Sequence, residues 1–243
     1  MRRRFFTDRF DSKSAIVRGD TAEHLGRVLR AEPGQLYELS DGERVWLARI
    51  ESVKSSKRSG HQIEFALMEE IAEQEAALRI QLLISLVKFD RFEWCLEKAT
   101  ELGVAEIVPL AGARSEKRLI SAAEKRSERW EKILRESAQQ SRQLKPPALF
   151  PVMRPENAFA NSRAGCQFIF SERLDARSIR SVQMGCLSKY ISVAIGPEGG
   201  WTDGEIGLAR TAGYFETSLG EGILRTETAV VSALAILRYA LSE

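Results

Sequence analysis

The clearest local signal in the sequence is Ile195-Gly-Pro-Glu-Gly-Gly-Trp-Thr-Asp203. It follows the apolar run Tyr190-Ile-Ser-Val-Ala-Ile195, which has the length and composition of a buried strand. It precedes a predicted helix over 202–212. A glycine-rich turn between a buried strand and a helix is typical of open α/β sheets, which bind ligands where their strands end. The segment therefore predicts a parallel sheet with a ligand site at its edge.

The other apolar runs after residue 72 repeat this strand–helix rhythm. We expect strands over 80–87, 105–110 and 167–170, and helices over 90–102, 121–143 and 226–241. Continuous apolar strands that alternate with helices are typical of a parallel sheet whose two faces are both covered. Residues 73–243 are therefore predicted to form an α/β domain.

Residues 1–72 have a different pattern, in which short apolar runs alternate with turn residues. We expect strands over 14–18, 35–39, 44–50 and 61–67, and a short helix over 22–29. The dipeptide Asp41-Gly42 lies between two of these runs and is a strong hairpin signal. Short strands joined in this way predict a small β-barrel or sandwich.

Composition and charge exclude several classes of protein. The 243 residues are 44% hydrophobic and 29% charged, which is ordinary for a globular protein, and a formal charge of +2 excludes a histone-like protein. No apolar run approaches the roughly 18 residues that span a bilayer, and the N-terminus lacks a signal-peptide core. With three cysteines in no close pair and only two histidines, we expect reduced thiols, no metal and a cytoplasmic location.

A second glycine-rich segment, Leu219-Gly-Glu-Gly-Ile-Leu-Arg-Thr-Glu-Thr-Ala229, leads directly into the final helix. Helix capping accounts for Thr226 and Glu227, but it does not require Gly220 and Gly222 as well. Neither glycine-rich segment has the spacing of a dinucleotide-binding or P-loop motif. Two such loops in one α/β domain predict two walls of one pocket.

The first thirty residues carry a local surplus of positive charge. Residues 2–30 hold eight Arg or Lys against four Asp or Glu, with aromatic residues between them. Basic side chains bind phosphates, and aromatic rings stack on unpaired bases. The alternative is a solvated face of the barrel. The predicted RNA-binding residues are Arg3, Arg4, Phe5, Phe6, His24, Arg27 and Arg30.

Together the two glycine-rich segments resemble the RsmE family of small-subunit rRNA uridine-N3 methyltransferases, within the SPOUT superfamily. The resemblance covers almost the whole chain. Further matches are Arg4-Phe-Phe, His24-Leu-x-x-Val-Leu-Arg30, Lys88-x-Asp-Arg-x-Glu-Trp94 and Lys98-Ala-Thr-Glu-Leu-Gly-Val104. The sequence departs from the family at Gln139-Gln-Ser-Arg-Gln143, where the family usually has Glu-Gln-x-Gly-Arg.

The resemblance implies a PUA-like N-terminal β-barrel, a C-terminal SPOUT-type parallel sheet with a trefoil knot, and a homodimer. It also implies that S-adenosylmethionine binds among the knot loops, and that the protein methylates N3 of uridine 1498 in 16S rRNA of the small ribosomal subunit. The expected cofactor-binding residues are Gly196, Pro197, Glu198, Gly199, Gly200, Leu219, Gly220, Ile223, Leu224, Arg225, Thr228 and Ala229.

Transfer of a methyl group from a sulfonium to uridine N3 requires in-line alignment of the reacting atoms and removal of the N3 proton. Arg225 suits an anionic partner, such as a phosphate, a cofactor carboxylate or the developing uridine anion. Glu198 and Glu227 are both candidates for the proton acceptor, and the sequence does not decide between them. The competing hypotheses are a non-catalytic RNA-binding protein with structural glycine loops and a nucleotide-dependent enzyme unrelated to RNA.

Overall fold

The computed structural model describes residues 3–8, 10–56, 60–72, 78–173, 175–179 and 188–241. The chain divides into two compact units. The first comprises Met1–Glu75 and Ala138–Pro146, and the second comprises Ala76–Ser137 and Pro147–Glu243. The acidic segment 71–77 between the two predicted domains lacks a strand pattern and is expected to be a linker; its residues 73–77 lie outside the described residues.

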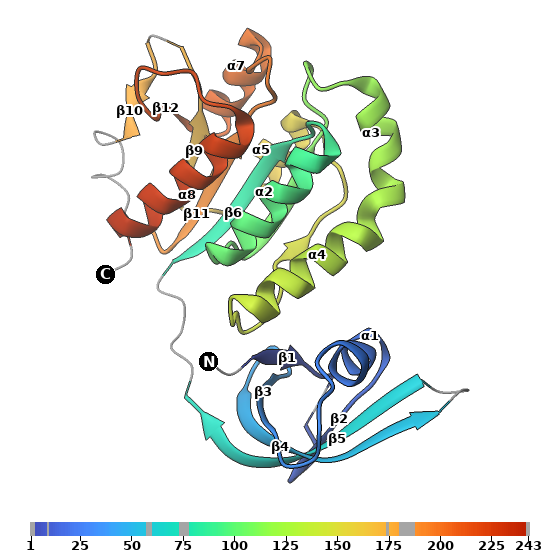
Figure 1. Ribbon diagram of the computed structural model, residues 1–243. Helices are drawn as coiled ribbons and strands as arrows, with labels where there is room; N and C mark the ends of the chain where they lie inside the picture. The colour runs from blue at the N-terminus through green and yellow to red at the C-terminus, as the bar shows by residue number, and fades with distance from the viewer. Residues whose placement is uncertain are drawn as a thin grey trace. The chain divides into compact units, whose positions relative to one another are not determined.

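The first unit is built on a five-stranded sheet in the order β1-β3-β4-β5-β2. Its strands are β1 (Arg4–Phe6), β2 (Ser14–Val17), β3 (Leu36–Ser40), β4 (Val45–Ser56) and β5 (Gly60–Ile71). β1 and β3 run parallel, and the other neighbours are antiparallel. Two register shifts between the long strands β4 and β5 help to bend the sheet into a half-barrel (Figure 1).

The predicted hairpin and helix of this unit are both confirmed. Asp41 Oδ1 accepts hydrogen bonds from the backbone N–H groups of Glu43 and Arg44, at 3.0 and 2.8 Å, in the turn between β3 and β4. Gly42 has φ +91°, a conformation that favours glycine. The short helix is found as α1 (Gly19–Glu23), which continues into a π-helical turn over His24–Val28.

Strand β1 corrects part of the predicted RNA-binding surface. Arg4, Phe5 and Phe6 are only 4%, 3% and 8% exposed. Arg4 Nε and Nη2 both donate to Glu38 Oε2 at 3.1 Å, and Arg4 Nη1 donates to the carbonyl of Arg142 at 2.8 Å. A buried guanidinium requires such partners because it has lost its water. These three residues hold the unit together and do not offer their side chains to phosphates or bases.

The segment Ala138–Pro146 completes the first unit. Arg142 Nη2 pairs with Glu38 Oε1 at 2.5 Å, and Ser40 Oγ donates to the carbonyl of Leu144 at 2.6 Å. Arg142 has φ +58°, a left-handed conformation that glycine adopts most readily. Arg142 stands where the family pattern has its glycine. The departure from that pattern therefore places an arginine in a glycine-type turn, and its side chain holds Glu38.

The second unit contains a seven-stranded parallel sheet in the order β10-β12-β9-β11-β6-β7-β8. Its strands are β6 (Arg79–Ser85), β7 (Glu106–Leu110), β8 (Ala148–Leu149), β9 (Cys166–Phe170), β10 (Arg177–Ser178), β11 (Tyr190–Ile195) and β12 (Phe215–Ser218). The predicted α/β architecture is therefore confirmed. The sequence did not predict β8, β10 and β12, since strands of two to four residues leave no periodic apolar pattern.

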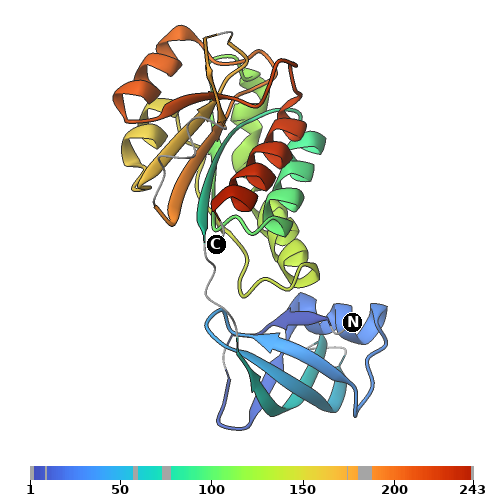
Figure 2. The same cartoon turned by 90° about the vertical axis from the view of Figure 1, so that its left-hand side faces the viewer.

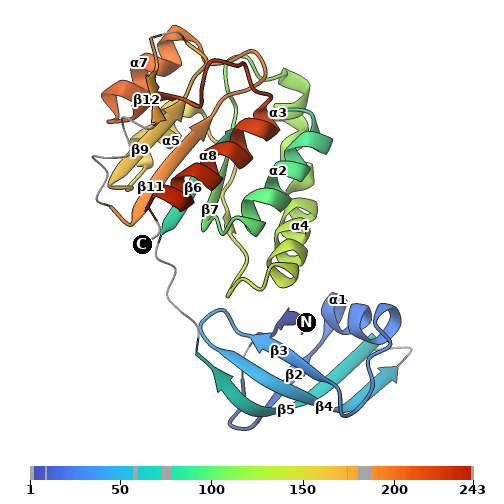
Figure 3. The same ribbon diagram turned by 60° about the vertical axis from the view of Figure 1, so that its left-hand side comes forward.

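Helices cover both faces of this sheet (Figures 1 and 2). One face carries α2 (Phe89–Glu101), α3 (Lys117–Ala123), α4 (Ser127–Gln140) and α8 (Thr226–Leu241). The other face carries α5 (Pro155–Asn161) and α7 (Asp203–Thr211). The single helix expected over 121–143 is interrupted by a 3₁₀ turn at Glu124–Arg126. α2 and α8 lie side by side on the sheet (Figure 3).

The two cysteines in the described part of the chain differ in state. Cys95 on α2 is a buried free thiol, and burial, with a smaller effect of the Glu227 charge, raises its pKa to about 12. Cys166 is disulfide-bonded, which corrects the expectation that all thiols are reduced. None of the described helices is long and apolar enough to cross a membrane.

Candidate functional site

A cavity of about 260 Å³ lies at the carboxyl ends of β9, β11 and β12. Open α/β sheets bind ligands at this edge because the loops that leave neighbouring strands separate there and form a crevice. The cavity walls come from the segments 170–173, 195–201 and 218–229, with Arg114 added from the loop after β7. Both glycine-rich segments therefore line one cavity, as their sequences predict.

The cavity contains eight of the twelve residues that were expected to bind a cofactor. These are Gly196, Pro197, Glu198, Gly200, Leu219, Gly220, Leu224 and Ala229. Gly199, Ile223, Arg225 and Thr228 are not among its lining residues. Ile223 is 80% exposed, and Arg225 is also exposed, so both side chains face solvent in this structure.

The wall that follows β9 was not predicted from the sequence. Ser171, Glu172 and Arg173 line the cavity there, and Arg114 joins them after β7. Ser171, Glu172 and Arg173 match no motif and include no glycine, whereas Arg114 belongs to the pair Arg114-Ser115, which also matches the family pattern. The one sequence signal of Ser171, Glu172 and Arg173 is their position directly after a predicted buried strand.

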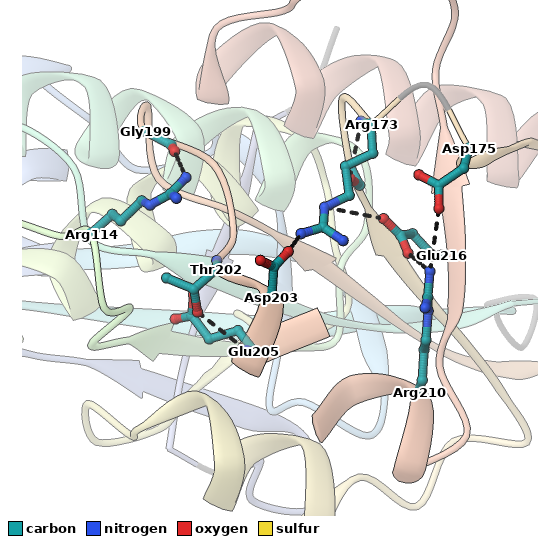
Figure 4. A network of polar contacts seen from close by, with 10 residues as sticks. Arg114, Arg173, Asp175, Gly199, Thr202, Asp203, Glu205, Arg210 and Glu216 are labelled. Atoms are coloured by element: carbon teal, nitrogen blue, oxygen red, sulfur yellow. Dashed lines mark hydrogen bonds and ion pairs between the residues drawn. The ribbon is translucent and has the colours of Figure 1, made fainter. Parts of the chain in front are cut away.

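The first glycine-rich loop is a tight turn held by an arginine (Figure 4). The N–H of Gly200 donates to the carbonyl of Pro197 at 2.8 Å, and Gly200 has φ +69°. Arg114 Nη1 donates to the carbonyl of Gly199 at 2.6 Å. A side chain at position 200 would be strained whatever the space around it, so the turn depends on glycine.

Trp201 anchors the same loop to the sheet. Its Nε1 donates to the carbonyl of Phe170 at 2.9 Å, and the indole is buried. A Cβ at position 196 would lie 3.1 Å from the indole ring, which is closer than side chains normally approach. Thr226 Oγ1 donates to the carbonyl of Gly196 at 3.3 Å. The start of α8 is therefore bonded directly to the first glycine-rich loop.

Helix α7 begins with a capping box (Figure 4). Glu205 Oε2 accepts hydrogen bonds from the N–H and the hydroxyl of Thr202, both at 2.8 Å. Glu205 Oε1 accepts from the N–H of Ala113 at 2.8 Å. One buried carboxylate thus fixes the end of the first glycine-rich segment and the loop after β7.

An ion-pair network supports the wall that follows β9 (Figure 4). Arg173 pairs with Asp203, and its Nε lies 4.0 Å from Glu216 Oε1. Arg210 Nη2 lies 2.6 Å from Glu216 Oε2 and 3.8 Å from Asp175 Oδ2. The buried Glu216 carboxylate therefore lies between two guanidinium groups. Because Arg173 is already neutralised by carboxylates, it shapes the cavity rather than offering a free positive charge.

The second glycine-rich loop turns sharply at Gly220. Its φ is +136°, which L-amino acids with side chains rarely adopt. The N–H of Gly220 donates to Ser218 Oγ at 3.1 Å, and Ser218 Oγ donates to the carbonyl of Gly220 at 2.8 Å. The end of β12 therefore sets the path of this wall.

The three predicted catalytic residues differ in their positions. Glu198 lines the cavity, whereas Glu227 and Arg225 do not. Arg91 of α2 faces both carboxylates: Nη1 lies 2.5 Å from Glu198 Oε1, and Nε lies 4.0 Å from Glu227 Oε1. Arg225 forms no ion pair with any residue that the structure describes. Within the same described ranges, no group of His, Cys, Asp or Glu side chains is arranged to hold a metal ion.

Comparison with known proteins identifies the family. Residues 74–238 match the model of the RNA methyltransferase domain, which covers more than half of the chain. The chain is 35% identical over 219 residues to the ribosomal RNA small subunit methyltransferase E of Synechocystis sp., covering 87% of this chain and 68% of that protein. The chain belongs to the ribosomal RNA small subunit methyltransferase E family. The Bacillus subtilis member is 30% identical over 231 residues, or 92% of this chain and 89% of that protein.

Two solved structures show the same fold. The family member from Neisseria gonorrhoeae was determined bound to S-adenosylmethionine. It is 29% identical, superposes with a TM-score of 0.86, and the match covers 98% of each chain. A Legionella pneumophila protein in complex with the same cofactor is 27% identical, with a TM-score of 0.85 over 99% of this chain and 98% of that one.

Proposed function

We propose that the protein is an S-adenosylmethionine-dependent methyltransferase that acts on N3 of uridine 1498 in 16S rRNA of the small ribosomal subunit. The observation that carries this function is the single cavity lined by both glycine-rich segments in a chain of this family. The finer features of the fold are proposed on the resemblance to the family: a PUA-like barrel over 1–72, a trefoil knot within 73–243 and a homodimer. A cytoplasmic location is proposed because the relatives are ribosomal RNA methyltransferases.

The residues around the cavity fit the cofactor. Gly200 and Gly220 adopt positive φ values in the two walls, so main-chain N–H and C=O groups border a space that no side chain at these positions fills. Apolar Leu219, Leu224 and Ala229 also line the cavity. Backbone polar groups beside apolar side chains are typical of nucleoside sites. S-adenosylmethionine supplies a methyl group on a positively charged sulfur.

The chain itself must orient the uridine and accept its N3 proton. Glu198 suits the acceptor role because it lines the cavity, whereas Glu227 does not. The exposed Arg225 lies within the second glycine-rich segment and suits an RNA phosphate or the developing uridine anion. No large new charge arises when an anion meets a sulfonium, so alignment, at about 7–11 kcal/mol, is the main contribution we expect.

The test is methylation of small ribosomal subunits that lack this modification, followed by mass-spectrometric mapping of the product. We expect a single added methyl group on N3 of the target uridine. Calorimetric titration with S-adenosylmethionine gives an independent result. Cofactor binding without methylation of the subunit would reject the proposed substrate. RNA binding without cofactor binding would establish the non-catalytic RNA-binding protein instead.

We further propose that the exposed basic residues of the first unit hold the rRNA. Arg3, His24, Arg27 and Arg30 are exposed; His24 and Arg27 lie in the π-helical turn, and Arg30 follows two residues after its end. Arg27 forms an i,i+4 ion pair with Glu23 at 3.4 Å. Such an exposed pair contributes little to stability, so Arg27 can exchange its partner for a phosphate at small cost.

Replacing Arg3, Arg27 and Arg30 together by alanine should weaken RNA binding and lower its salt dependence. Each lost phosphate contact should reduce the slope of log affinity against log salt by about 0.7–0.9. Cofactor affinity should not change, because no lining residue of the cavity is altered. Arg44, Arg49 and Lys54, exposed on and beside β4, provide a triple-alanine control with the same change in charge. Equal slopes for the two triple variants would show that the three arginines only solvate the surface.

The proposed homodimer is expected to use the outer side of α8. Val230, Leu234 and Leu237 are buried in the core, but Tyr239 on the same helix is 93% exposed. Light scattering should therefore give a particle of about 55 kDa, twice the 27.3 kDa of one chain. Tyr239→Asp should shift the particle toward the mass of one chain. Leu208→Asp, at an exposed apolar position on α7, is the matched control. A 27 kDa particle for the unmodified protein at micromolar concentration contradicts the dimer.

A further inference from the structure

Arg91 links the two glycine-rich loops from a third element of the fold. It lies in the first turn of α2, outside both loops and outside the cavity lining. Its guanidinium is 2.5 Å from Glu198 in the first loop and 4.0 Å from Glu227 at the start of α8. One side chain therefore contacts a carboxylate from each of the two segments that form the site.

The packing of α2 fixes this position. Phe92, Cys95 and Leu96 are buried in the core, and α2 runs beside α8 (Figures 1 and 3). Arg91 is one helical turn before Cys95, whose pKa is raised in part by the Glu227 charge. Glu227 therefore lies near both residues. Since this turn of α2 is packed in the core, the backbone that carries the Arg91 side chain is held in place.

Glu227 needs this arginine because its carboxylate is only partly satisfied. Glu227 Oε2 is buried and has no hydrogen-bond partner in the structure. Among the described residues, Arg91 is the one cation that pairs with it. A buried carboxylate without a counter-charge is costly, so the Arg91 guanidinium is held toward Glu227 while its other end holds Glu198.

We propose that Arg91 is a positioning residue for methyl transfer, which it serves by fixing the Glu198 carboxylate at the cavity. This inference rests on the proposed function. Arg91 occupies Glu198 Oε1, which leaves Oε2 available to accept the uridine N3 proton, and Glu227 pairs with the Nε of the same guanidinium at 4.0 Å. Arg91 itself is not among the residues that line the cavity, so it acts through Glu198.

An ordinary exposed ion pair would behave differently. Such pairs change stability very little and have no effect on turnover. A positioning residue instead changes kcat more than KM, because misplacing a reacting group by about 1 Å costs on the order of 100-fold in rate. The chain contains another arginine–carboxylate pair, made by residues that do not line the cavity: Arg129 of α4 contacts Glu93 of α2 at 2.8 Å through two nitrogens, and Glu93 also accepts a hydrogen bond from Arg126 at 3.2 Å.

The experiment compares Arg91→Met, Arg91→Lys and the control Arg129→Met by steady-state methylation and by calorimetric titration with S-adenosylmethionine. For Arg91→Met we expect kcat to fall by roughly 10- to 100-fold while KM and the cofactor Kd change by less than about threefold. Arg91→Lys should recover part of the loss, and Arg129→Met should match the unmodified protein. An unchanged kcat in Arg91→Met, or an equal loss in Arg129→Met, overturns the proposal.

A double-mutant cycle of Arg91→Met, Glu198→Gln and the double variant, measured by thermal unfolding, tests the same interaction without an activity assay. The decrease in Tm of the double variant should be smaller than the sum of the decreases in the two single variants, because each substitution removes the same ion pair. Additive losses overturn the positioning role. If the unmodified protein fails to methylate the subunit while the cycle shows coupling, the proposed function is wrong but the link between Arg91 and Glu198 stands.

Discussion

Gly220→Val is expected to raise the dissociation constant for S-adenosylmethionine by about 5- to 150-fold. Gly220 has φ +136°, and holding a residue with a side chain in such a region costs about 1–3 kcal/mol. A Cβ at this position meets no atom within 4 Å, so the penalty arises from the backbone rather than from a clash. The loop would relax to another path and move one wall of the cavity. Calorimetric titration measures the effect.

Gly207→Ala is the matched control for this prediction. Gly207 lies within α7, has no positive φ, and has nothing within 4 Å of an added Cβ. The alanine variant should bind the cofactor as the unmodified protein does, and its helical circular dichroism should be unchanged. Equal cofactor affinity in Gly220→Val and Gly207→Ala would remove the second glycine-rich loop from the proposed site.

Glu198→Gln is expected to lower kcat by about 10²- to 10⁴-fold, the usual contribution of a general base. The amide keeps the size of the side chain but cannot take up the N3 proton. Cofactor affinity should stay within about threefold, because the change affects the transition state rather than the bound ground state. Steady-state methylation of small subunits and calorimetric titration give the two measurements.

Glu227→Gln separates the two candidate carboxylates. Glu227 does not line the cavity, so its amide should lower kcat less than Glu198→Gln does, through a weaker hold on Arg91. The opposite order of the two variants would transfer the proton-accepting role to Glu227. Equal and full activity in both variants would require a base from outside these two residues.

The sequence predicts the main strands and helices of the second unit because their apolar runs are long. β6, β11 and α8 each bury continuous apolar runs, and such periodicity is readable without tertiary context. Apolar patterning does not reveal the burial of β1, because Arg4-Phe-Phe resembles an exposed basic and aromatic patch. The burial of that strand depends on Glu38 and Arg142, which lie 34 and 138 residues away. Contacts between residues so far apart in the chain leave no pattern in the sequence around β1.

The cavity was predictable to the extent that its walls contain glycine. Gly196, Gly200 and Gly220 mark positions where the backbone needs unusual dihedral angles or close approach, and such needs are visible in sequence. Arg91 was present in a matched motif, but its role depends on α2 lying beside α8. Ser171, Glu172 and Arg173 line the cavity because β9 ends beside β11. Strand order is a property of the sheet, not of any segment.

The division of the first unit into two chain segments sets an order of events during synthesis on the ribosome. The hydrogen bond from Arg4 to the carbonyl of Arg142 cannot form until 138 more residues have been synthesised. The hydrogen bond from Ser40 to the carbonyl of Leu144 requires 104 more residues. At about 5–20 residues per second, Arg4 is without this acceptor for roughly 7–28 s. Until then the nascent half-barrel lacks the acceptors for Arg4 and Ser40, so its last stage of folding cannot precede emergence of the segment Ala138–Pro146 from the ribosome.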